Sequence, residues 1–373
     1  MTRPRLASLA AGLPATVPFV GPEAIERKLG KPFRARLGAN ESGFGPSPKV
    51  LAAMTAAGAE SWKYGDPEIH DLRGAIAAHL GVGLEQVAVG EGVDALLGLA
   101  ARLYIEPGAP VVTSIGGYPT FDFHVVGYGG REVKVPYAAD REDLAGLLNA
   151  VRREKSRLVY LANPDNPMGT WWSAAEVTAF IDALPAETML ILDEAYGELA
   201  PEGTLPPIHP LRPNALRMRT FSKAYGMAGV RVGYVIGQAE AIAPFDRVRN
   251  HFSVSRIAQA GAIAALADQA YLADVTARIE AARERLYRIA QANGFEPIPS
   301  ATNFVAVDCK RDGAFAKAVL DALATRGVFV RKPMVPVLDR CIRISVGPDD
   351  ELDVLEAELP QAIAEARRVT AAA

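Results

Sequence analysis

A lysine, two hydroxyl residues and an arginine lie close together in residues 220–231, and these residue types suit nucleophilic and anion-binding chemistry. Strand-like runs flank the stretch, so Lys223 is expected near a buried sheet, where desolvation favours its neutral, nucleophilic amine. Thr220, Ser222 and the guanidinium of Arg231 are good phosphate ligands. A nucleophilic lysine beside a phosphate site predicts pyridoxal phosphate held as a Schiff base. The alternative is a solvated loop lysine followed by a surface arginine.

An asparagine lies in a turn-forming segment directly after another strand-like run. Two Asn-Pro pairs in residues 163–170 predict a turn after the run at 158–161. Open α/β sheets bind ligands at the carboxyl ends of their strands, so Asn166 could donate its amide to an oxygen of a bound ring. The alternative is a loop that needs only its prolines.

A carboxylate and a tyrosine follow the continuous apolar run at 189–192. Asp193 is expected at a buried strand end, where a carboxylate is costly unless it is paired with a cation. A protonated pyridine nitrogen is such a cation, and this pairing keeps the ring an effective electron sink. Tyr196 could hydrogen-bond the phenolic oxygen of the same ring. The alternatives are a helix cap or a metal-binding pair with Glu194, although no histidine lies nearby.

Two weaker signals lie earlier in the chain. Glu91 and Gly92 precede a predicted helix, whose first backbone N–H groups would suit an anion, although a plain tight turn explains these residues equally well. Tyr118 follows a predicted strand and could stack on a planar ring, or it could be a core tyrosine.

The elements expected to position these residues alternate between strand and helix from about residue 85 to 236. Continuous apolar runs of this kind belong to parallel or mixed sheets with helices on both faces. The predicted strands are 86–89, 110–115, 132–135, 158–161, 189–192, 216–219 and 230–236. The predicted helices are 93–104, 120–128, 141–153 and 173–183, the last with a capping box of Ser173 and Glu176.

The length of 373 residues favours two domains. After residue 253 the pattern changes to long helices with a few later strands. We therefore expect an N-terminal arm at 1–39, a large cofactor-binding α/β domain at 40–250 and a smaller α+β domain at 251–373. The arm is expected to pack on the body or on a partner.

The composition is typical of a soluble enzyme, with 50% hydrophobic and 22% charged residues. A net charge of −3 offers no basic face for nucleic acid, and no apolar run is long enough to span a bilayer. Cys309 and Cys341 lie far apart without metal-ligand spacing, which indicates no metal and a reducing compartment. The first residues weakly resemble a signal peptide, but prolines interrupt them, so we expect a cytoplasmic protein.

These motifs together resemble the class I and II aminotransferases of fold type I. The order Asn-Pro-x-Asn-Pro-x-Gly, Asp-x-x-Tyr, Ser-Lys-Ala and a following arginine carries the resemblance. Residues 37–48, 220–231 and 342–347 are most similar to the histidinol-phosphate aminotransferase branch. The resemblance covers about residues 35–360. It implies pyridoxal 5'-phosphate as the cofactor and a mixed, mostly parallel seven-stranded sheet between helices, with a smaller α+β domain.

The resemblance also implies roles for individual residues. Lys223 is implied as the Schiff-base lysine and proton carrier, Asp193 as the partner of the pyridine nitrogen, and Arg343 as the residue that binds the substrate carboxylate. The other implied cofactor contacts are Asn166 and Tyr196 with the ring oxygen, Tyr118 with the ring face, and Glu91, Gly92, Thr220, Ser222 and Arg231 with the phosphate. Asn40 and Arg331 are expected at the substrate, and Tyr64 is expected to reach the neighbour's phosphate across a homodimer.

The implied reaction transfers an amino group from an amino acid or amino-phosphate to a 2-oxo acid such as 2-oxoglutarate. Ser42 and Gly43 stand where this branch usually has Asn-Pro, and residues 331–336 also depart from its pattern. Both histidinol phosphate and an aromatic amino acid therefore stay open as the amino donor. The alternatives are an amino-acid-phosphate decarboxylase similar to threonine-phosphate decarboxylase, and a non-catalytic sensor that only binds the cofactor.

Overall fold

The computed structural model describes residues 4–14 and 20–371, and within them a mixed sheet of seven strands carries the predicted site. In spatial order the strands are β2 (Val87–Gly90), β8 (Gly233–Ile236), β7 (Ala215–Thr220), β6 (Met189–Asp193), β5 (Leu158–Ala162), β3 (Pro110–Ser114) and β4 (Arg131–Val135). All neighbours from β7 to β4 are parallel, and β8 runs antiparallel to both β2 and β7. The predicted mixed, mostly parallel sheet is confirmed.

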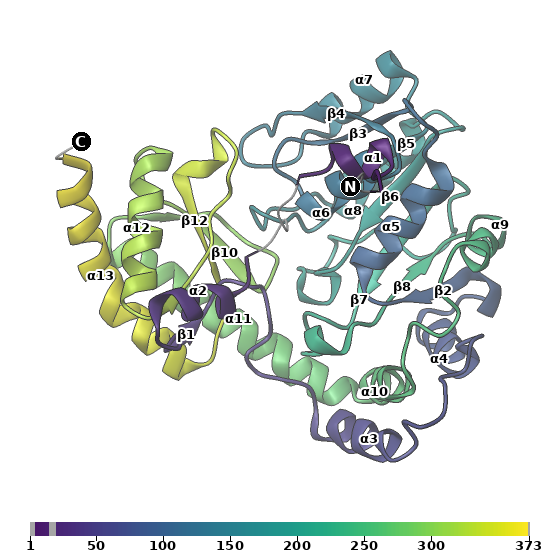
Figure 1. Cartoon of the computed structure of the whole chain (residues 1–373), viewed down its shortest axis with the longest axis horizontal. Helices are drawn as coiled ribbons and strands as arrows, with labels where there is room; N and C mark the ends of the chain where they lie inside the picture. The colour runs from purple at the N-terminus through teal and green to yellow at the C-terminus, as the bar shows by residue number, and fades with distance from the viewer. Residues whose placement is uncertain (1–3, 15–19, 372–373) are drawn as a thin grey trace.

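Helices cover both faces of this sheet (Figure 1). On one face, α5 (Val93–Tyr104) and α6 (Pro119–Gly127) share a core with Tyr160 and Ala162 of β5. On the other face, α7 (Leu144–Glu154) and α8 (Ala174–Ala183) share a core with Val159 and Leu161 of the same strand. Successive side chains of a strand point to opposite faces, so β5 is apolar at every position because both of its faces are buried.

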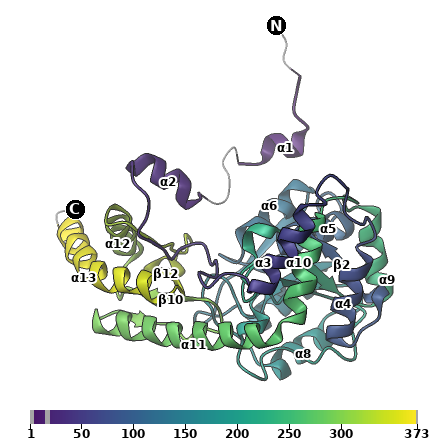
Figure 2. The same cartoon turned by 90° about the horizontal axis from the view of Figure 1, so that it is seen from below.

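A third group of helices packs beside β2 and β8. It consists of α3 (Pro48–Gly58), α4 (His70–Leu80) and α10 (Arg256–Ala267), which lie side by side in Figures 1 and 2. From α10 the long helix α11 (Gln269–Ala292) leads to the C-terminal part of the chain. No helix in the described ranges is both long and apolar enough to cross a membrane.

The C-terminal part contains a small antiparallel sheet with the order β12 (Cys341–Ser345), β10 (Phe304–Asp308) and β9 (Glu296–Pro297). The helices α11, α12 (Gly313–Thr325) and α13 (Asp349–Ala371) share a core with it. The early strand β1 (Ala35–Arg36) pairs with β11 (Val328–Phe329), which brings the segment after α2 (Pro22–Leu29) to this part of the fold. The helix α1 (Ser8–Gly12) instead contacts α6. The domain boundaries at residues 40 and 250 stay predictions.

Two predicted elements begin later than expected. The strand predicted from residue 230 begins at Gly233, because residues 228–230 form the 3-10 helix η3 (Ala228–Val230) and Arg231 has a left-handed backbone with φ 59°. The helix predicted from Arg141 begins at Leu144, because the Asp143 side chain accepts a hydrogen bond from the Gly146 N–H and caps it there. The capping box at the start of α8 is confirmed.

The remaining helical elements are short. They are α9 (Ala239–Ile242) and the 3-10 helices η1 (Leu84–Gln86), η2 (Gly197–Leu199), η4 (Ala243–Arg247) and η5 (Leu338–Arg340).

Candidate active site

The polar residues that follow β5, β6 and β7 meet at one pocket of about 310 Å³. This meeting follows from the topology, because parallel neighbours present their carboxyl ends at the same edge of a sheet. The predicted site residues that line the pocket are Asn40, Tyr118, Asn166, Asp193, Tyr196, Thr220, Ser222, Lys223, Arg231, Arg331 and Arg343. Three predicted site residues, Glu91, Gly92 and Tyr64, do not line it.

The amine of Lys223 projects into this pocket rather than into solvent. Its Nζ donates to the backbone carbonyl of Asn40 at 3.0 Å and lies 5.6 Å from the centre of the Tyr196 ring. Burial, with the positive charges of Arg343 and Arg231, lowers the pKa of Lys223 to about 8. The alternative of a solvated loop lysine is therefore wrong, and about one tenth of the amine is neutral at pH 7, far more than for an ordinary lysine.

Asn40 connects the N-terminal segment to three other parts of the site. Its Nδ2 donates to the Tyr196 hydroxyl at 3.0 Å, and its backbone N–H donates to Ser345 Oγ at 2.9 Å. Its carbonyl accepts from both Lys223 Nζ and Asn303 Nδ2, the latter at 3.1 Å. Asn40 reaches these partners with a left-handed backbone of φ 55°, a conformation that asparagine tolerates better than most residues.

Asp193 lies at the end of β6 with a hydrogen bond to each carboxylate oxygen. Oδ1 accepts from the Ala195 N–H at 2.9 Å, and Oδ2 accepts from the Tyr160 hydroxyl at 2.8 Å. Burial raises the pKa of Asp193 to about 6, while both hydrogen bonds and the charge of Lys223 favour the ionised form. The site thus holds a buried carboxylate whose negative charge faces a pocket that could accept a cation.

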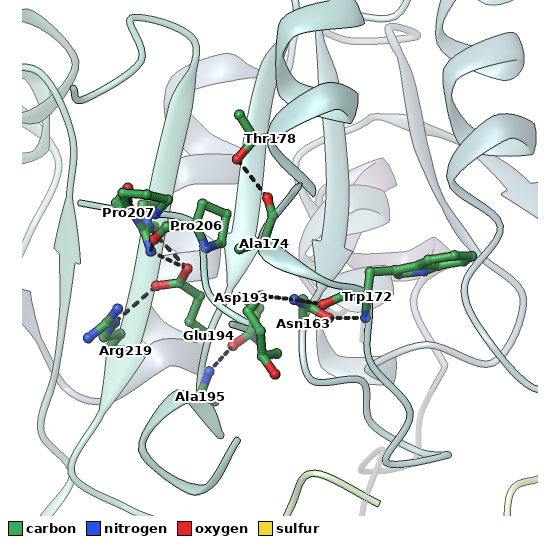
Figure 3. Close-up of polar contacts among 12 residues, drawn as sticks. Asn163, Trp172, Ala174, Thr178, Asp193, Glu194, Ala195, Pro206, Pro207 and Arg219 are labelled. Atoms are coloured by element: carbon green, nitrogen blue, oxygen red, sulfur yellow. Dashed lines mark hydrogen bonds and ion pairs between the residues drawn. The ribbon is translucent and has the colours of Figure 1, made fainter. Parts of the chain in front are cut away.

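The neighbouring Glu194 points away from Asp193, as Figure 3 shows. Its Oε1 accepts from Arg217 at 2.7 Å, and its Oε2 accepts from Arg219 at 2.9 Å. Because Glu194 is fully buried and both of its oxygens are bonded to arginines, it is a structural ion-pair partner. The alternative of a metal-binding pair with Asp193 is therefore wrong. Within residues 4–14 and 20–371, no group of three or more His, Cys, Asp or Glu side chains is arranged around a metal position.

The two asparagines of the loop after β5 differ in what they contact. Asn163 is fully buried and bonds the backbone of Trp172, accepting from its N–H at 2.8 Å and donating to its carbonyl at 3.2 Å (Figure 3). Asn166 reaches the pocket, where its Oδ1 accepts from Arg343 Nη1 at 2.6 Å. Asn163 thus shapes the loop, and Asn166 is the asparagine that a ligand can contact.

The hydroxyls and the arginine of the 220–231 stretch form an anion-binding corner. Thr220 Oγ1 and Ser222 Oγ are hydrogen-bonded at 2.9 Å, and Arg231 Nη1 lies 3.5 Å from Ser222 Oγ. Arg231 Nη2 donates to the Glu91 carbonyl at 3.2 Å. Glu91 and Gly92 do not line the pocket, whereas Val93 and Asp94 of α5 do, and the predicted contact of the Glu91 and Gly92 backbone with the phosphate stays a prediction.

Gly92 has a specific reason to be glycine. It is the N-cap of α5 with φ 90°, and a Cβ built on it would lie 2.5 Å from Arg231 Nη2. A side chain at this position would displace the guanidinium from the anion-binding corner and would also strain the backbone. Gly92 therefore contributes by leaving room for Arg231.

Two arginines of the C-terminal part complete the pocket. Arg331 and Arg343 are adjacent because their backbones pair in a β-bridge. The Nε of Arg343 is buried and has no hydrogen-bond acceptor among the described residues. Burial and the nearby Arg331 lower the pKa of Arg343 to about 10. Arg331 also donates from Nη2 to the Val20 carbonyl at 2.7 Å, which links the pocket to the N-terminal segment. Two adjacent guanidiniums with one open donor suit an anionic ligand.

Tyr118 borders the pocket at the start of α6, and burial raises its pKa to about 12. Tyr64 instead lies on the surface with 79% of its area exposed, and its ring centre lies 4.8 Å from that of Phe252. A single chain therefore brings eleven of the fourteen predicted site residues to the pocket, whereas Glu91 and Gly92 lie beside Arg231 and Tyr64 lies on the surface.

The polar residues at the site that sequence reasoning missed include Tyr160, Asp94, Glu41, Asn303 and Ser345. A signal existed for Tyr160. It carries the one polar side-chain group in the apolar run at 158–161, and a buried hydroxyl needs a hydrogen-bond partner. Asn303 and Ser345 gave no such signal, since their partner Asn40 is remote in the sequence.

Comparisons with known proteins agree with this geometry. The model of the family "Aminotransferase class I and II" matches residues 35–359. The chain is 38% identical over 341 residues to a histidinol-phosphate aminotransferase of Anaeromyxobacter sp., covering 90% of this chain and 93% of that protein. It is 37% identical over 334 residues to histidinol-phosphate aminotransferase 1 of Mesorhizobium japonicum, covering 88% and 90%.

A solved structure is also similar along nearly the whole chain. It is the histidinol-phosphate aminotransferase from Sinorhizobium meliloti in complex with pyridoxal-5'-phosphate, which has a TM-score of 0.95 and 57% identity and covers 97% of this chain and 98% of that one. The predicted fold type, aminotransferase activity and cofactor are thus confirmed, while the roles of individual residues stay predictions. The chain belongs to the class I and II aminotransferases.

Proposed function

We propose that this aminotransferase moves the amino group of histidinol phosphate to a 2-oxo acid such as 2-oxoglutarate. The observation that carries the proposal is the pair of adjacent guanidiniums, Arg331 and Arg343, in the same pocket as the Lys223 amine. The names of the relatives support the same substrate.

The residues of the pocket fit pyridoxal 5'-phosphate. Asp193 would pair with the ring nitrogen, Tyr118 would contact the ring face, and Ser222 and Arg231 would hold the phosphate. Two observations support this fit: Asp193 is a buried carboxylate with pocket-facing charge, and Gly92 leaves the space that the guanidinium of Arg231 occupies. When bound, the cofactor supplies an electron sink for the bonding pair that remains when the substrate's Cα–H bond breaks.

The chain's own contribution to the reaction is centred on Lys223. With a pKa lowered to about 8, its Nζ can take the α-proton as a neutral amine and can return a proton in the second half of the reaction. The carbonyl of Asn40 holds Nζ in the pocket at 3.0 Å. Asn166 and Tyr196 would hydrogen-bond the ring oxygen.

Arg331 and Arg343 would bind the anionic group of each substrate in turn. Histidinol phosphate has a phosphate and no carboxylate, whereas the 2-oxo acid has carboxylates and no phosphate. A guanidinium binds either group with paired N–H donors, so one arginine pair can serve both half-reactions. The open Nε donor of Arg343 supports this role, because a buried cation is stabilised when an anion pairs with it.

We also propose that the enzyme is a homodimer in which Tyr64 reaches the phosphate of the neighbour's site. The rings of Tyr64 and Phe252 are in contact, and Trp62 lies two residues before Tyr64; the three residues have 79%, 53% and 78% of their areas exposed. Large aromatic residues that cluster on a surface are typical of protein–protein interfaces. We further propose the cytoplasm as its location, since buried free thiols such as Cys309 and Cys341 suit a reducing compartment.

The experiment that tests the donor compares single half-reactions. The cofactor-loaded enzyme is mixed with histidinol phosphate, with histidinol, or with an aromatic amino acid, and the loss of the aldehyde form of the cofactor is followed by absorbance. We expect fast conversion with histidinol phosphate and at least about a tenfold slower rate with histidinol, which lacks only the phosphate. Conversion that is fastest with an aromatic amino acid would reject histidinol phosphate as the donor. Carbon dioxide release from an added amino-acid phosphate, without dependence on a 2-oxo acid, would instead favour the decarboxylase.

A further inference from the structure

Tyr160 is fully buried in the middle of the large sheet, and its hydroxyl has a charged partner. Only 1% of the residue is exposed, and its hydroxyl donates to Asp193 Oδ2 at 2.8 Å. Burial raises the pKa of Tyr160 well above its usual range, with the nearby carboxylates adding to the effect. The hydroxyl therefore keeps its proton near neutral pH, and Tyr160 is the donor in this bond.

The sheet register places this donor beside Asp193. Ala162 of β5 pairs with Asp193 of β6, and Tyr160 lies two residues before Ala162 on the same face of β5. Tyr160 and Asp193 are thus diagonal neighbours across two parallel strands, which a long side chain can bridge. The ring of Tyr160 stacks on that of Phe121, with ring centres 4.8 Å apart and planes inclined by 22°.

The helix that supplies Phe121 also borders the pocket. It is α6, which begins directly after Tyr118, so one short element contributes the residue expected at the ring face and the residue that packs on Tyr160. Phe121 is fully buried, and this leaves the Tyr160 ring with little freedom to turn away from the carboxylate.

Asp193 is the residue proposed to face the ring nitrogen of the cofactor. Its Oδ1 is bonded by the Ala195 N–H and its Oδ2 by Tyr160, and each oxygen has a further lone pair. Both bonds stabilise the charged carboxylate against its burial. Without the Tyr160 hydroxyl, Oδ2 would lose its donor and the carboxylate could rotate or take up a proton.

We propose that Tyr160 is a positioning residue that keeps the Asp193 carboxylate ionised and aimed at the ring nitrogen of pyridoxal phosphate. The proposal deepens the proposed function, because it rests on the role of Asp193 beside that nitrogen. Tyr160 would act through Asp193, to which its hydroxyl is bonded.

The test measures cofactor binding to the cofactor-free enzyme, by quenching of protein fluorescence, for wild type and Tyr160→Phe. Two ligands are compared: pyridoxal phosphate and its deaza analogue, in which a C–H group replaces the ring nitrogen. A hydrogen bond to a charged group corresponds to about a tenfold to hundredfold change in an equilibrium constant. We expect Tyr160→Phe to weaken binding of pyridoxal phosphate by about tenfold or more and to leave the affinity for the analogue unchanged.

Tyr137→Phe is the matched control. Tyr137 is a second inward-facing tyrosine whose hydroxyl donates to a buried carboxylate, Asp165 Oδ1, at 2.7 Å. Its loss should lower the melting temperature of the cofactor-free enzyme about as much as Tyr160→Phe does, without changing the affinity for pyridoxal phosphate. Equal weakening of both ligands by Tyr160→Phe would mean that Tyr160 only supports packing, and unchanged affinities for both would also overturn the proposal.

Asp193→Asn separates this inference from the proposed function. It should weaken pyridoxal phosphate but not the analogue, and Tyr160→Phe should add no further loss in the Asp193→Asn background. If Asp193→Asn has no effect, the proposed role of Asp193 fails. If it has the expected effect and Tyr160→Phe does not, only the inference on Tyr160 fails. Should Tyr160→Phe not fold, Phe121→Leu provides the second variant, with the same selective but smaller loss expected.

Discussion

Arg343 Nη1 donates to Asn166 Oδ1 at 2.6 Å, and this bond joins strand β12 to the loop that follows β5. The two residues are expected to contact different ligands, the substrate anion and the ring oxygen of the cofactor. Their bond therefore links the two binding functions directly. A substrate anion that pairs with Arg343 would also define where the Asn166 amide lies relative to the ring.

Arg343→Lys should lower kcat/KM by about 100-fold, because the lysine keeps the charge but loses the paired donors and the fork that also reaches Asn166. Steady-state kinetics with the amino donor and the 2-oxo acid varied in turn provide the measurement, with the exposed Arg288→Lys as the control. Unchanged KM values for both substrates would contradict a role for Arg343 in anion binding.

Lys223→Ala should reduce turnover by at least about 10² to 10⁴-fold, because the variant lacks the group proposed to move the α-proton. Treatment with borohydride should attach the cofactor covalently to wild type but not to the variant, as read by mass spectrometry. Lys317→Ala, which removes an exposed lysine paired with Asp321, should behave as wild type in both assays. Covalent attachment that persists in Lys223→Ala would show that another residue holds the cofactor.

Lys223→Met should stabilise the cofactor-free enzyme near neutral pH. Burial lowers the folded-state pKa of Lys223 to about 8, below its ordinary value of 10.5, so the unfolded chain holds this proton more tightly. Burying the charged Lys223 amine therefore lowers the free energy of unfolding of wild type by its full amount below pH 8. This destabilisation is lost as the pH rises from 8 to 10.5. We expect a gain of on the order of 1 to 2 kcal/mol for Lys223→Met at neutral pH.

Denaturant unfolding of both proteins over this pH range measures the difference. The stability of wild type should approach that of Lys223→Met as the pH rises from 8 to 10.5. A stability difference that is constant with pH would mean that the Lys223 amine titrates normally in the folded protein.

Gly92→Ala should weaken cofactor binding by about tenfold or more, because its Cβ would lie 2.5 Å from Arg231 Nη2 and displace the guanidinium from the phosphate site. The control is Gly294→Ala, whose φ of 76° is also positive but whose Cβ would meet no atom within 4 Å. Both variants should lose stability from backbone strain, and Gly92→Ala should lose more because φ 90° with ψ 170° is populated almost only by glycine. Only Gly92→Ala should raise the Kd for pyridoxal phosphate, and equal Kd values for the two variants would contradict the clash.

Mixed dimers can test whether Tyr64 acts on the neighbouring site. Tyr64→Ala and Lys223→Ala should each be impaired as homodimers, since one lacks the proposed phosphate contact and the other the proton carrier. When the two variants are unfolded and refolded together, a mixed dimer has one site with both residues intact. Activity above the sum of the separately refolded variants is expected. Absence of this recovery, with mixed dimers verified by mass, would place Tyr64 outside the neighbour's site.

The residues that the sequence predicted well lie in short motifs directly after strands. Lys223, Asp193 and Asn166 could be assigned because each follows a recognisable apolar run, and the carboxyl ends of parallel strands meet at one edge. The predicted strand from residue 230 began too early, because residues 228–230 form a 3-10 helix and Arg231 has a left-handed backbone, with its side chain bonded to the distant Glu91 carbonyl. The periodicity of nearby residues carries no information on a contact between segments that are distant in the sequence.

The sequence by itself determined the family, the cofactor and the pocket residues of the central motifs, because their residue types and order carry that information locally. Only the tertiary structure decided how the site is assembled around them. It brought the Asn40 carbonyl to Lys223 Nζ and the Tyr160 hydroxyl to Asp193 Oδ2 as hydrogen-bond partners. It also gave Arg231 an acceptor at the Glu91 carbonyl and space beside Gly92. These relationships depend on strand order, register and close packing between distant segments, and no residue type or spacing along the chain specifies them.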